Sequence, residues 1–150
     1  MMTNRKAREE HLKGVESTLG APLPRRQTIH SAGYDFYLPH DIRLLPREWT
    51  TFSTGIRFTD DISPGVDRWV MELYPRSSYS LRYGLRIRNT VPIIDQDYRG
   101  EIMMSLTADV PLDLKAGDRV VQGIFKPYLV LDGEIEPESV RDGGIGSTGE

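Results

Sequence analysis

The chain has 150 residues, a formal net charge of -3 from 19 Lys and Arg against 22 Asp and Glu, and no cysteine. This balance excludes an overall electrostatic attraction to nucleic acid or to an anionic membrane, and the missing cysteines exclude disulfides, zinc–thiolate sites and thiol catalysis. A hydrophobic share of 38 %, with 14 Gly and 10 Pro, suits one small, turn-rich β domain that buries further apolar surface in an oligomer.

The start of the chain, residues 1–30, is predicted to be an N-terminal arm that ends in a proline-stiffened, extended entry. The arm begins with charged residues and contains no apolar core like that of a signal peptide. No window of the chain approaches the ~18 apolar residues that a membrane helix needs. We therefore expect a cytoplasmic protein with neither a membrane nor a nucleic acid as partner.

Residues 31–140 are predicted to form one β domain of short strands. Proline and glycine break residues 38–58 into short segments. After them, Trp69, Met71 and Leu73 alternate with Val70, Glu72 and Tyr74, a period of two. A long stripe of period 3.6 is absent from the sequence. Short strands with frequent turn signals favour an all-β barrel or sandwich.

Asp35 lies between Tyr34 and Phe36, at the start of the first strong strand signal. A carboxylate between aromatic residues should be paired, most simply with an arginine. The preceding Gly33 would let the backbone pass close to a neighbour. An ion pair that only fixes the strand explains these residues as well as a functional site does.

The segment from Pro75 to Gly84 predicts the end of a strand and a helix of one or two turns. Pro75 stops the pairing, Ser77 or Ser78 can cap the helix, and Gly84 can close it. Arg76 together with free N–H groups and two hydroxyls makes a phosphate site from local chemistry. An ordinary capped turn with an exposed arginine fits the same residues.

The segment from Ile93 to Ile102 is interpreted as a β-hairpin with a polar tip. The tip carries two carboxylates, a phenol and a guanidinium, on Asp95, Asp97, Tyr98 and Arg99. A turn needs only one or two polar residues to satisfy its backbone, so four such groups favour a functional site. On this segment alone, a solvated turn without function remains an alternative.

Two further segments complete the pattern. Residues 119–125 predict a strand with an internal glycine and a polar Gln122. Residues 141–150 contain four glycines with Ser and Thr, and they cannot pack a core. Backbone N–H groups of such a tail can wrap an anion once it arrives.

Taken together, five segments resemble, in order, the five motifs of the trimeric dUTP diphosphatases (dUTPases). The matches span residues 31–149, with family-like spacing. They are Ala32–Phe36, Pro75–Ser78, Asn89–Ile102, Gly117–Gln122 and Arg141–Gly149. The resemblance implies an all-β, jelly-roll-like barrel of the β-clip type with one short helix, assembled as a homotrimer. Each active site would take motifs one, two and four from one chain, the third from a second chain, and the tail, residues 141–150, from a third.

The resemblance also implies a reaction, the hydrolysis of dUTP to dUMP and pyrophosphate. Asp95 would orient and deprotonate the water that attacks the α-phosphorus, a role that suits a carboxylate ionised at neutral pH. Mg2+ would bridge oxygens of the triphosphate and complete its shell with water, so no direct protein ligand to the metal is expected.

On the phosphate side, the resemblance assigns Arg76, Ser77 and Ser78 to the phosphate chain, with Ser77 facing the oxygen that bridges the α and β phosphates. Gln122 would add a phosphate-side hydrogen bond. Asp35 and Arg119 would hold the geometry of the site without touching the substrate.

On the nucleoside side, uracil would bind in the hairpin, at Ile94 and its backbone, with the Asn89 amide reading O4 and N3–H. Tyr98 would lie flat against deoxyribose and leave no room for a 2′-hydroxyl. Pro92 departs from the glycine usual in the family, which reshapes the entry to this pocket.

In the tail, Arg141 would clamp the γ end of the triphosphate together with Ser147 and Thr148, and Ile145 and Gly146 would cover the nucleotide. Ile145 stands where the family usually has a phenylalanine that stacks on uracil. An aliphatic residue covers the base without that stacking, so a weaker lid is predicted.

Two alternatives belong to other functions. A dCTP deaminase shares the fold and the Arg-Ser-Ser segment, but residues 102–107 lack the glutamate which that chemistry needs. A regulatory module with a protein partner would keep the fold and the trimer; the intact set of site residues argues against a dead enzyme without excluding an additional binding role.

Overall fold

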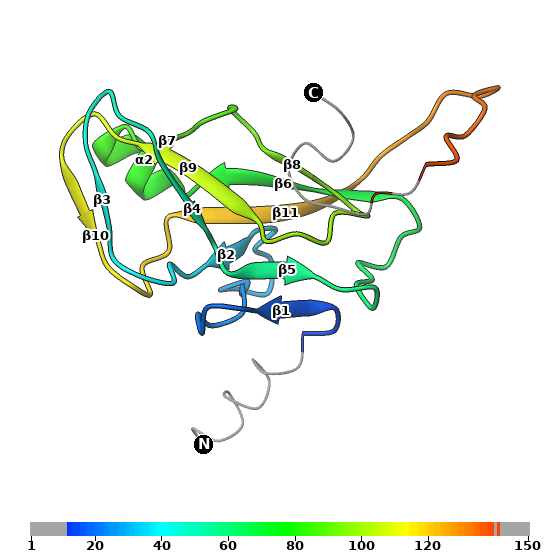
Figure 1. The fold of residues 1–150 in the computed structure, drawn as a ribbon, viewed down its shortest axis with the longest axis horizontal. Helices are drawn as coiled ribbons and strands as arrows, with labels where there is room; N and C mark the ends of the chain where they lie inside the picture. The colour runs from blue at the N-terminus through cyan, green and yellow to red at the C-terminus, as the bar shows by residue number, and fades with distance from the viewer. Residues whose placement is uncertain (1–11, 140, 142–150) are drawn as a thin grey trace, which may run out of the picture.

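The computed structural model describes residues 12–139 and residue 141 (Figure 1). In this part of the chain the fold is mostly β with one short helix, as predicted. The first eleven residues and most of the predicted tail, including Ile145, Gly146, Ser147 and Thr148, lie outside the described residues. The elements are β1 (Val15–Ser17), β2 (Tyr34–Phe36), β3 (Ile42–Leu44), β4 (Thr50–Ser53), β5 (Ile56–Phe58), β6 (Trp69–Pro75), α2 (Ser77–Tyr83), β7 (Arg86–Ile87), β8 (Ile93–Asp95), β9 (Met103–Thr107), β10 (Leu112–Leu114) and β11 (Val121–Pro127).

The first sheet consists of four antiparallel strands in the order β2-β11-β6-β8. Its long strand β6 alternates as predicted, because Trp69, Met71 and Leu73 are buried while the residues between them are half-buried. The buried side of this sheet is called the inner face here, and the opposite side, which carries Val70, Glu72 and Tyr74, the outer face. Paired residues share a face, so Asp35, Gln122 and Asp95 also lie on the outer face.

The second sheet has the order β4-β9-β7 and shares the apolar core with the first sheet. Phe52, Met104 and Leu106 on its strands are buried together with Met71 and Leu73 of the first sheet. Two smaller pairs, β1 with β5 and β10 with β3, complete the described strands.

The strands of the described part form four separate sheets, and these are not hydrogen-bonded into one closed barrel. The sequence-based expectation of a jelly-roll-like barrel is therefore met only as a mostly β fold. Many of the strands are only three residues long, because proline and glycine interrupt the pairing before a ladder can continue around the core.

The β-hairpin predicted at residues 93–102 is wrong. β8 pairs with β6, whereas β9 pairs with β4 and β7, so the two flanking strands belong to different sheets. A hairpin needs a link of about 2–5 residues, but here the connection carries the buried Tyr98 and Ile102 into the core. The segment therefore crosses from one sheet to the other.

Helix α2 begins at Ser77 with Arg76 as its N-cap, and no side chain makes a capping hydrogen bond. The predicted cap by Ser77 or Ser78 is therefore wrong. The Arg76 N–H instead donates to the carbonyl of Val120 at 2.8 Å, which keeps Arg76 in the extended conformation. The first helical residue is therefore Ser77. Gly84 ends the helix with φ 64°, as predicted, because glycine adopts this left-handed conformation without strain.

Candidate active site

One group of predicted site residues gathers where β2, β6 and β11 lie side by side. We call Asp35, Arg76, Arg119 and Gln122 the arginine cluster. Asp35 is 5 % exposed. Its carboxylate forms ion pairs with Nε of Arg76 at 3.5 Å and with Nη1 of Arg119 at 3.4 Å. The predicted pairing of Asp35 with arginine is confirmed. Arg76 also donates through Nη1 to the backbone carbonyl of Arg119 at 3.1 Å, so the two arginines are linked to each other as well as to Asp35.

Gln122 is held in the same cluster by the register of three strands, opposite Asp35 on β2 and Tyr74 on β6. A Cβ atom placed on Gly33 would lie 2.1 Å from Oε1 of Gln122. The close approach predicted for Gly33 is therefore confirmed, and only glycine leaves this space for the Gln122 amide. Ser77 and Ser78 follow Arg76 directly and are exposed.

A second group lies in the connection between the two sheets, residues 95–101, which we call the acidic loop. Two side chains anchor it to the body. Oε1 of Gln96 accepts the Trp69 N–H at 3.0 Å, and the ring of Tyr98 is buried in the apolar core. Within the loop, the Tyr98 hydroxyl donates to the carbonyl of Glu101 at 2.8 Å. Burial raises the pKa of the Tyr98 phenol above its ordinary value, so the hydroxyl keeps its proton. Asp95 remains half-exposed at the start of the loop.

A cavity of about 500 Å³ lies beside the acidic loop. The structure brings five predicted site residues to its wall, and they are Asn89, Ile94, Asp95, Tyr98 and Arg141. Asn89 and Thr90 have φ values of 75° and 61°. A left-handed β-branched residue such as Thr90 is uncommon and stores strain, which is a feature of many functional sites.

Sequence reasoning missed Arg88, which also lines this cavity and lies 5.6 Å from the ring centroid of Trp49. Arg88 is exposed, whereas Leu85 and Ile87 of the same segment are buried. An arginine next to Asn89 was the available signal, but nothing in the sequence placed Trp49 beside it.

Arg141 lies across the acidic loop of its own chain. Its Nη2 donates to Oδ2 of Asp95 at 2.7 Å, and its Nε donates to Oδ1 of Asp97 at 3.1 Å. Its guanidinium carbon also lies 5.9 Å from the ring centroid of Tyr98, within the range of a cation–π contact.

The arginine cluster and the acidic loop lie at opposite ends of the outer face of the first sheet. Asp95 is opposite Val70 at the start of β6, and Arg76 follows the end of that strand. Arg76 lies six positions after Val70, one past the end of β6, which is about 20 Å at about 3.3 Å per position. The structure therefore brings together each half of the predicted site, but it does not bring the two halves together within one chain.

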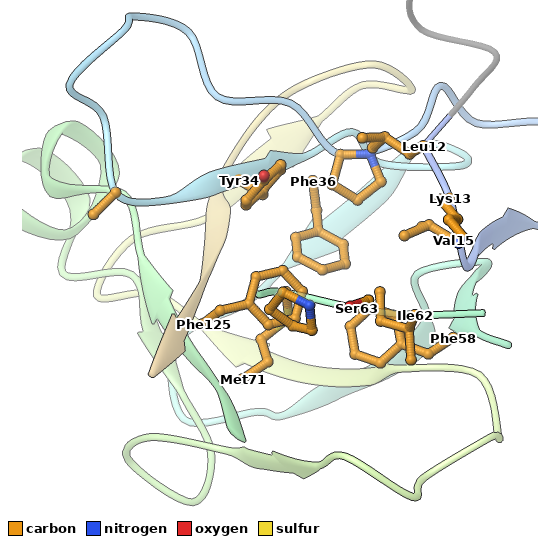
Figure 2. Close-up of a pocket in the computed structure, with 13 residues that line it drawn as sticks. Leu12, Lys13, Val15, Tyr34, Phe36, Phe58, Ile62, Ser63, Met71 and Phe125 are labelled. Carbon is orange, nitrogen blue, oxygen red and sulfur yellow. The ribbon is translucent and has the colours of Figure 1, made fainter. Parts of the chain in front are cut away.

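A different cavity, of about 360 Å³, opens on the inner face among Tyr34, Phe36, Phe58 and Phe125 (Figure 2). None of the predicted site residues lines it. Among the described residues there is no group of three or more His, Cys, Asp or Glu that could hold a metal ion. The described helix is also too short and too polar to cross a membrane.

These features define the class of protein. It is a mostly β domain with two separate groups of polar residues, the arginine cluster around the buried Asp35 and the cavity beside the half-exposed Asp95. Residues 20–149 match the profile of one family, the dUTPases. The chain belongs to the dUTPase family.

Relatives with curated names agree with this assignment. The chain is 36 % identical over 139 residues to the deoxyuridine 5'-triphosphate nucleotidohydrolase of Lactococcus lactis subsp. lactis, covering 87 % of this chain and 89 % of the relative. It is 38 % identical over 136 residues to the protein of the same name from Finegoldia magna, covering 85 % and 92 %.

Solved structures show the same fold. The dUTPase of Streptococcus mutans superposes with a TM-score of 0.66 at 31 % identity, over 80 % of this chain and 99 % of that one. The dUTPase of Staphylococcus bacteriophage 80alpha reaches a TM-score of 0.68 at 22 % identity, over 93 % and 99 %. The second likeness is one of fold alone.

Proposed function

We propose that this chain is a dUTP diphosphatase that hydrolyses dUTP to dUMP and pyrophosphate in the cytoplasm. Membership of the dUTPase family supports the reaction class. The observation that carries the proposal is the presence of both halves of the site on one sheet face, about 20 Å apart. Neither half is sufficient alone, because one offers cations and the other offers a carboxylate beside a cavity.

The two halves meet when copies of the chain associate head to tail. The arginine cluster of one copy then faces the acidic loop of the next, and such a contact closes into a ring when the rotation allows it. We propose a homotrimer, the ring that the five motifs imply. The half-buried or exposed apolar side chains Val70, Ile93 and Ile124 on the outer face supply surface for this contact.

In the assembled site, Asp95 accepts a proton from water and directs it at the α-phosphorus, in line with the departing pyrophosphate. A half-exposed carboxylate suits this role because water reaches it freely. Asp95 has a second oxygen, Oδ1, besides the one that accepts Arg141.

The phosphate chain binds at the arginine cluster of the other copy. Arg76 presents a guanidinium that the buried Asp35 holds in place, and Arg119 completes this support. Ser77, Ser78 and Gln122 add hydrogen bonds, with Ser77 at the oxygen where charge grows as the bond breaks. We propose that Mg2+ arrives on the triphosphate. As the resemblance implies, the ion would be held by phosphate oxygens and water, and it would neutralise charge on the phosphate chain.

The nucleoside binds in the cavity at the acidic loop. Asn89 and the backbone at Ile94 read the uracil edge, and cytosine leaves those groups unpaired at a cost of about 1–3 kcal/mol each. The Tyr98 hydroxyl is occupied by the Glu101 carbonyl, so its ring face, and not its polar end, contacts deoxyribose and excludes a 2′-hydroxyl.

The remaining assignments are proposals from the same resemblance. Residues 31–140 are the catalytic domain, residues 1–30 its arm, and residues 141–150 the closing tail. Within that tail, Ile145, Gly146, Ser147 and Thr148 cover the base and the γ-phosphate.

The test is pyrophosphate release from dUTP, UTP, dCTP and dTTP, with Mg2+ present and then chelated. We expect turnover of dUTP alone, and its loss on chelation. Ammonia release from dCTP would instead identify a deaminase. Absence of turnover, together with a protein partner captured in a manner that depends on a non-hydrolysable dUTP analogue, would identify a regulatory module.

A further inference from the structure

We propose that Glu72, Tyr74 and Lys126 form the contact at the centre of the ring, where they select and align the neighbouring copies of the chain. We call these three residues the polar triad. The inference rests on the proposed function and deepens it, because it names side chains that decide which partner is accepted. That partner is a second copy of this chain, and the triad does not contact substrate.

The polar triad is built on the two central strands of the first sheet, β6 and β11, which lie side by side (Figure 1). Nζ of Lys126 donates to Oε2 of Glu72 at 2.8 Å and to the Tyr74 hydroxyl at 3.1 Å. The Tyr74 hydroxyl in turn donates to Oε2 of Glu72. Because each group bonds the other two, the triad holds both signs of charge in one arrangement.

The triad lies between the two halves of the site, and apolar side chains surround it. Ile93 and Ile124 are the strand neighbours of Glu72, and Val70 is the neighbour of Lys126. Ile93 is 53 % exposed, although it lies in a sheet, and the Glu72 side chain is only 21 % exposed in a single copy. In a contact between copies, the apolar area supplies affinity, whereas a pair of charges within it fixes the register.

The geometry of a closed ring brings the three triads together. The arginine cluster and the acidic loop lie at opposite ends of the outer face, and each meets its counterpart on a different neighbour. The outer face is then one side of a triangle, and its apolar residues are covered when it is turned toward the axis. Sides of about 20–30 Å, which include room for a nucleotide, put the axis about 6–9 Å from the middle of each side. The long side chains of the triad therefore reach those of the neighbouring copies.

The two signs of charge make the triad complementary to itself under rotation. Lys126 of one copy approaches Glu72 of the next, and the same contact repeats around the ring. A neighbour with another arrangement of charges places like charges together, which costs binding free energy. The triad therefore favours identical copies in one alignment, the alignment that joins the two halves of the site.

Single-charge variants give the first test. Glu72→Gln and Lys126→Gln each leave like charges unbalanced at the axis, so the concentration at which trimers half-dissociate should rise about 10-fold or more. Sedimentation equilibrium over a dilution series measures this concentration, and circular dichroism checks that each variant is folded. The matched control is Asp113→Asn, which breaks an exposed ion pair with Arg43 outside the first sheet. Equal dissociation in the control and in both variants would overturn the inference.

A charge swap gives the second test, which separates a contact between copies from an ion pair that only stabilises one copy. The swapped chain carries Glu72→Lys together with Lys126→Glu, so it keeps an internal pair and should form trimers of its own. When swapped and wild-type chains with different tags are refolded together in equal amounts, like charges meet across each mixed contact. We expect mixed trimers well below the statistical share of about three quarters. A statistical share would overturn the inference, because a triad confined to one copy does not sort the chains.

The activity of the same proteins separates this inference from the proposed function. The triad lies outside both halves of the site, so kcat per assembled trimer should match wild type at high protein concentration. A wild-type chain without dUTP turnover would contradict the proposed function. Wild-type turnover, with single variants that dissociate like the control and a swapped chain that mixes statistically, would overturn the role of the triad alone.

Discussion

The arginine cluster and the acidic loop lie on the same sheet, yet different forces hold them. The cluster is fixed by backbone register and by one buried carboxylate that faces two guanidinium groups. The loop leaves the sheet and is anchored by side chains, through the hydrogen bond of Gln96 with Trp69 and through the burial of Tyr98 in the core. In the proposed site, the half that is fixed by register would present charges to the triphosphate, and the half that is anchored by side chains keeps its carboxylate half-exposed. Three substitutions break or sharpen this comparison.

The largest effect is expected from Asp95→Asn. An amide of the same shape cannot take the proton from water, so kcat should fall about 10²–10⁴-fold, with little change in the free energy of unfolding because Asp95 is half-exposed. Steady-state pyrophosphate release and urea unfolding measure the two quantities. Asp60→Asn is the control, since it removes an exposed carboxylate paired with Arg99 outside the cavity. An Asp95→Asn enzyme with unchanged kcat would contradict the role of the loop.

Asp35→Asn should act in the opposite way, on stability first. Removing the charge leaves two arginines facing a neutral group in a buried position, which costs about 2–4 kcal/mol of unfolding free energy after allowance for the partly exposed guanidinium groups. Urea or thermal unfolding measures the loss. The matched control is Asp113→Asn, whose partner Arg43 forms an exposed pair at 3.0 Å; we expect less than about 1 kcal/mol there. Equal losses in the two variants would mean that the cluster is not a buried anchor.

The smallest effect is expected from Tyr98→Phe. The ring stays and the hydrogen bond to Glu101 is lost, so the free energy of unfolding should fall by about 1 kcal/mol, while the preference for dUTP over UTP is retained. A large loss of that preference would show that the hydroxyl, and not the ring face, reads the sugar.

The same variant gives a pH prediction. Burial raises the Tyr98 pKa in the folded protein above the ordinary value of 10.0, so above that pH the unfolded chain loses its proton first. The contribution of Tyr98 is complete below pH 10.0 and is lost as the pH rises through the folded pKa. Unfolding titrations should therefore show wild type losing stability more steeply than Tyr98→Phe above pH 10. Parallel curves for the two proteins would contradict this.

Much of the fold and of each half-site was predictable because the signals are local. The alternation of β6, the glycine that ends α2, the arginine partner of Asp35 and the space at Gly33 all follow from neighbouring residues or from the chemistry of one side chain. The resemblance of five segments identified the family, which the profile match confirms.

Two local predictions failed because a distant contact decided them. The expected hairpin at residues 93–102 is a crossing between sheets, since Tyr98 and Ile102 are drawn into the shared core. The expected serine cap is absent because the backbone of Arg76 is held by Val120 on β11. Neither partner is recognisable from the segment itself.

By itself, the sequence determined which side chains this protein has for its chemistry and the short-strand fold that carries them, because periodicity, turn residues and pairing needs act over a few residues. Only the tertiary structure decided that these side chains form two groups about 20 Å apart, and that Glu72, Tyr74 and Lys126 meet between them. Both depend on strand register, and register is fixed by the packing of the whole core.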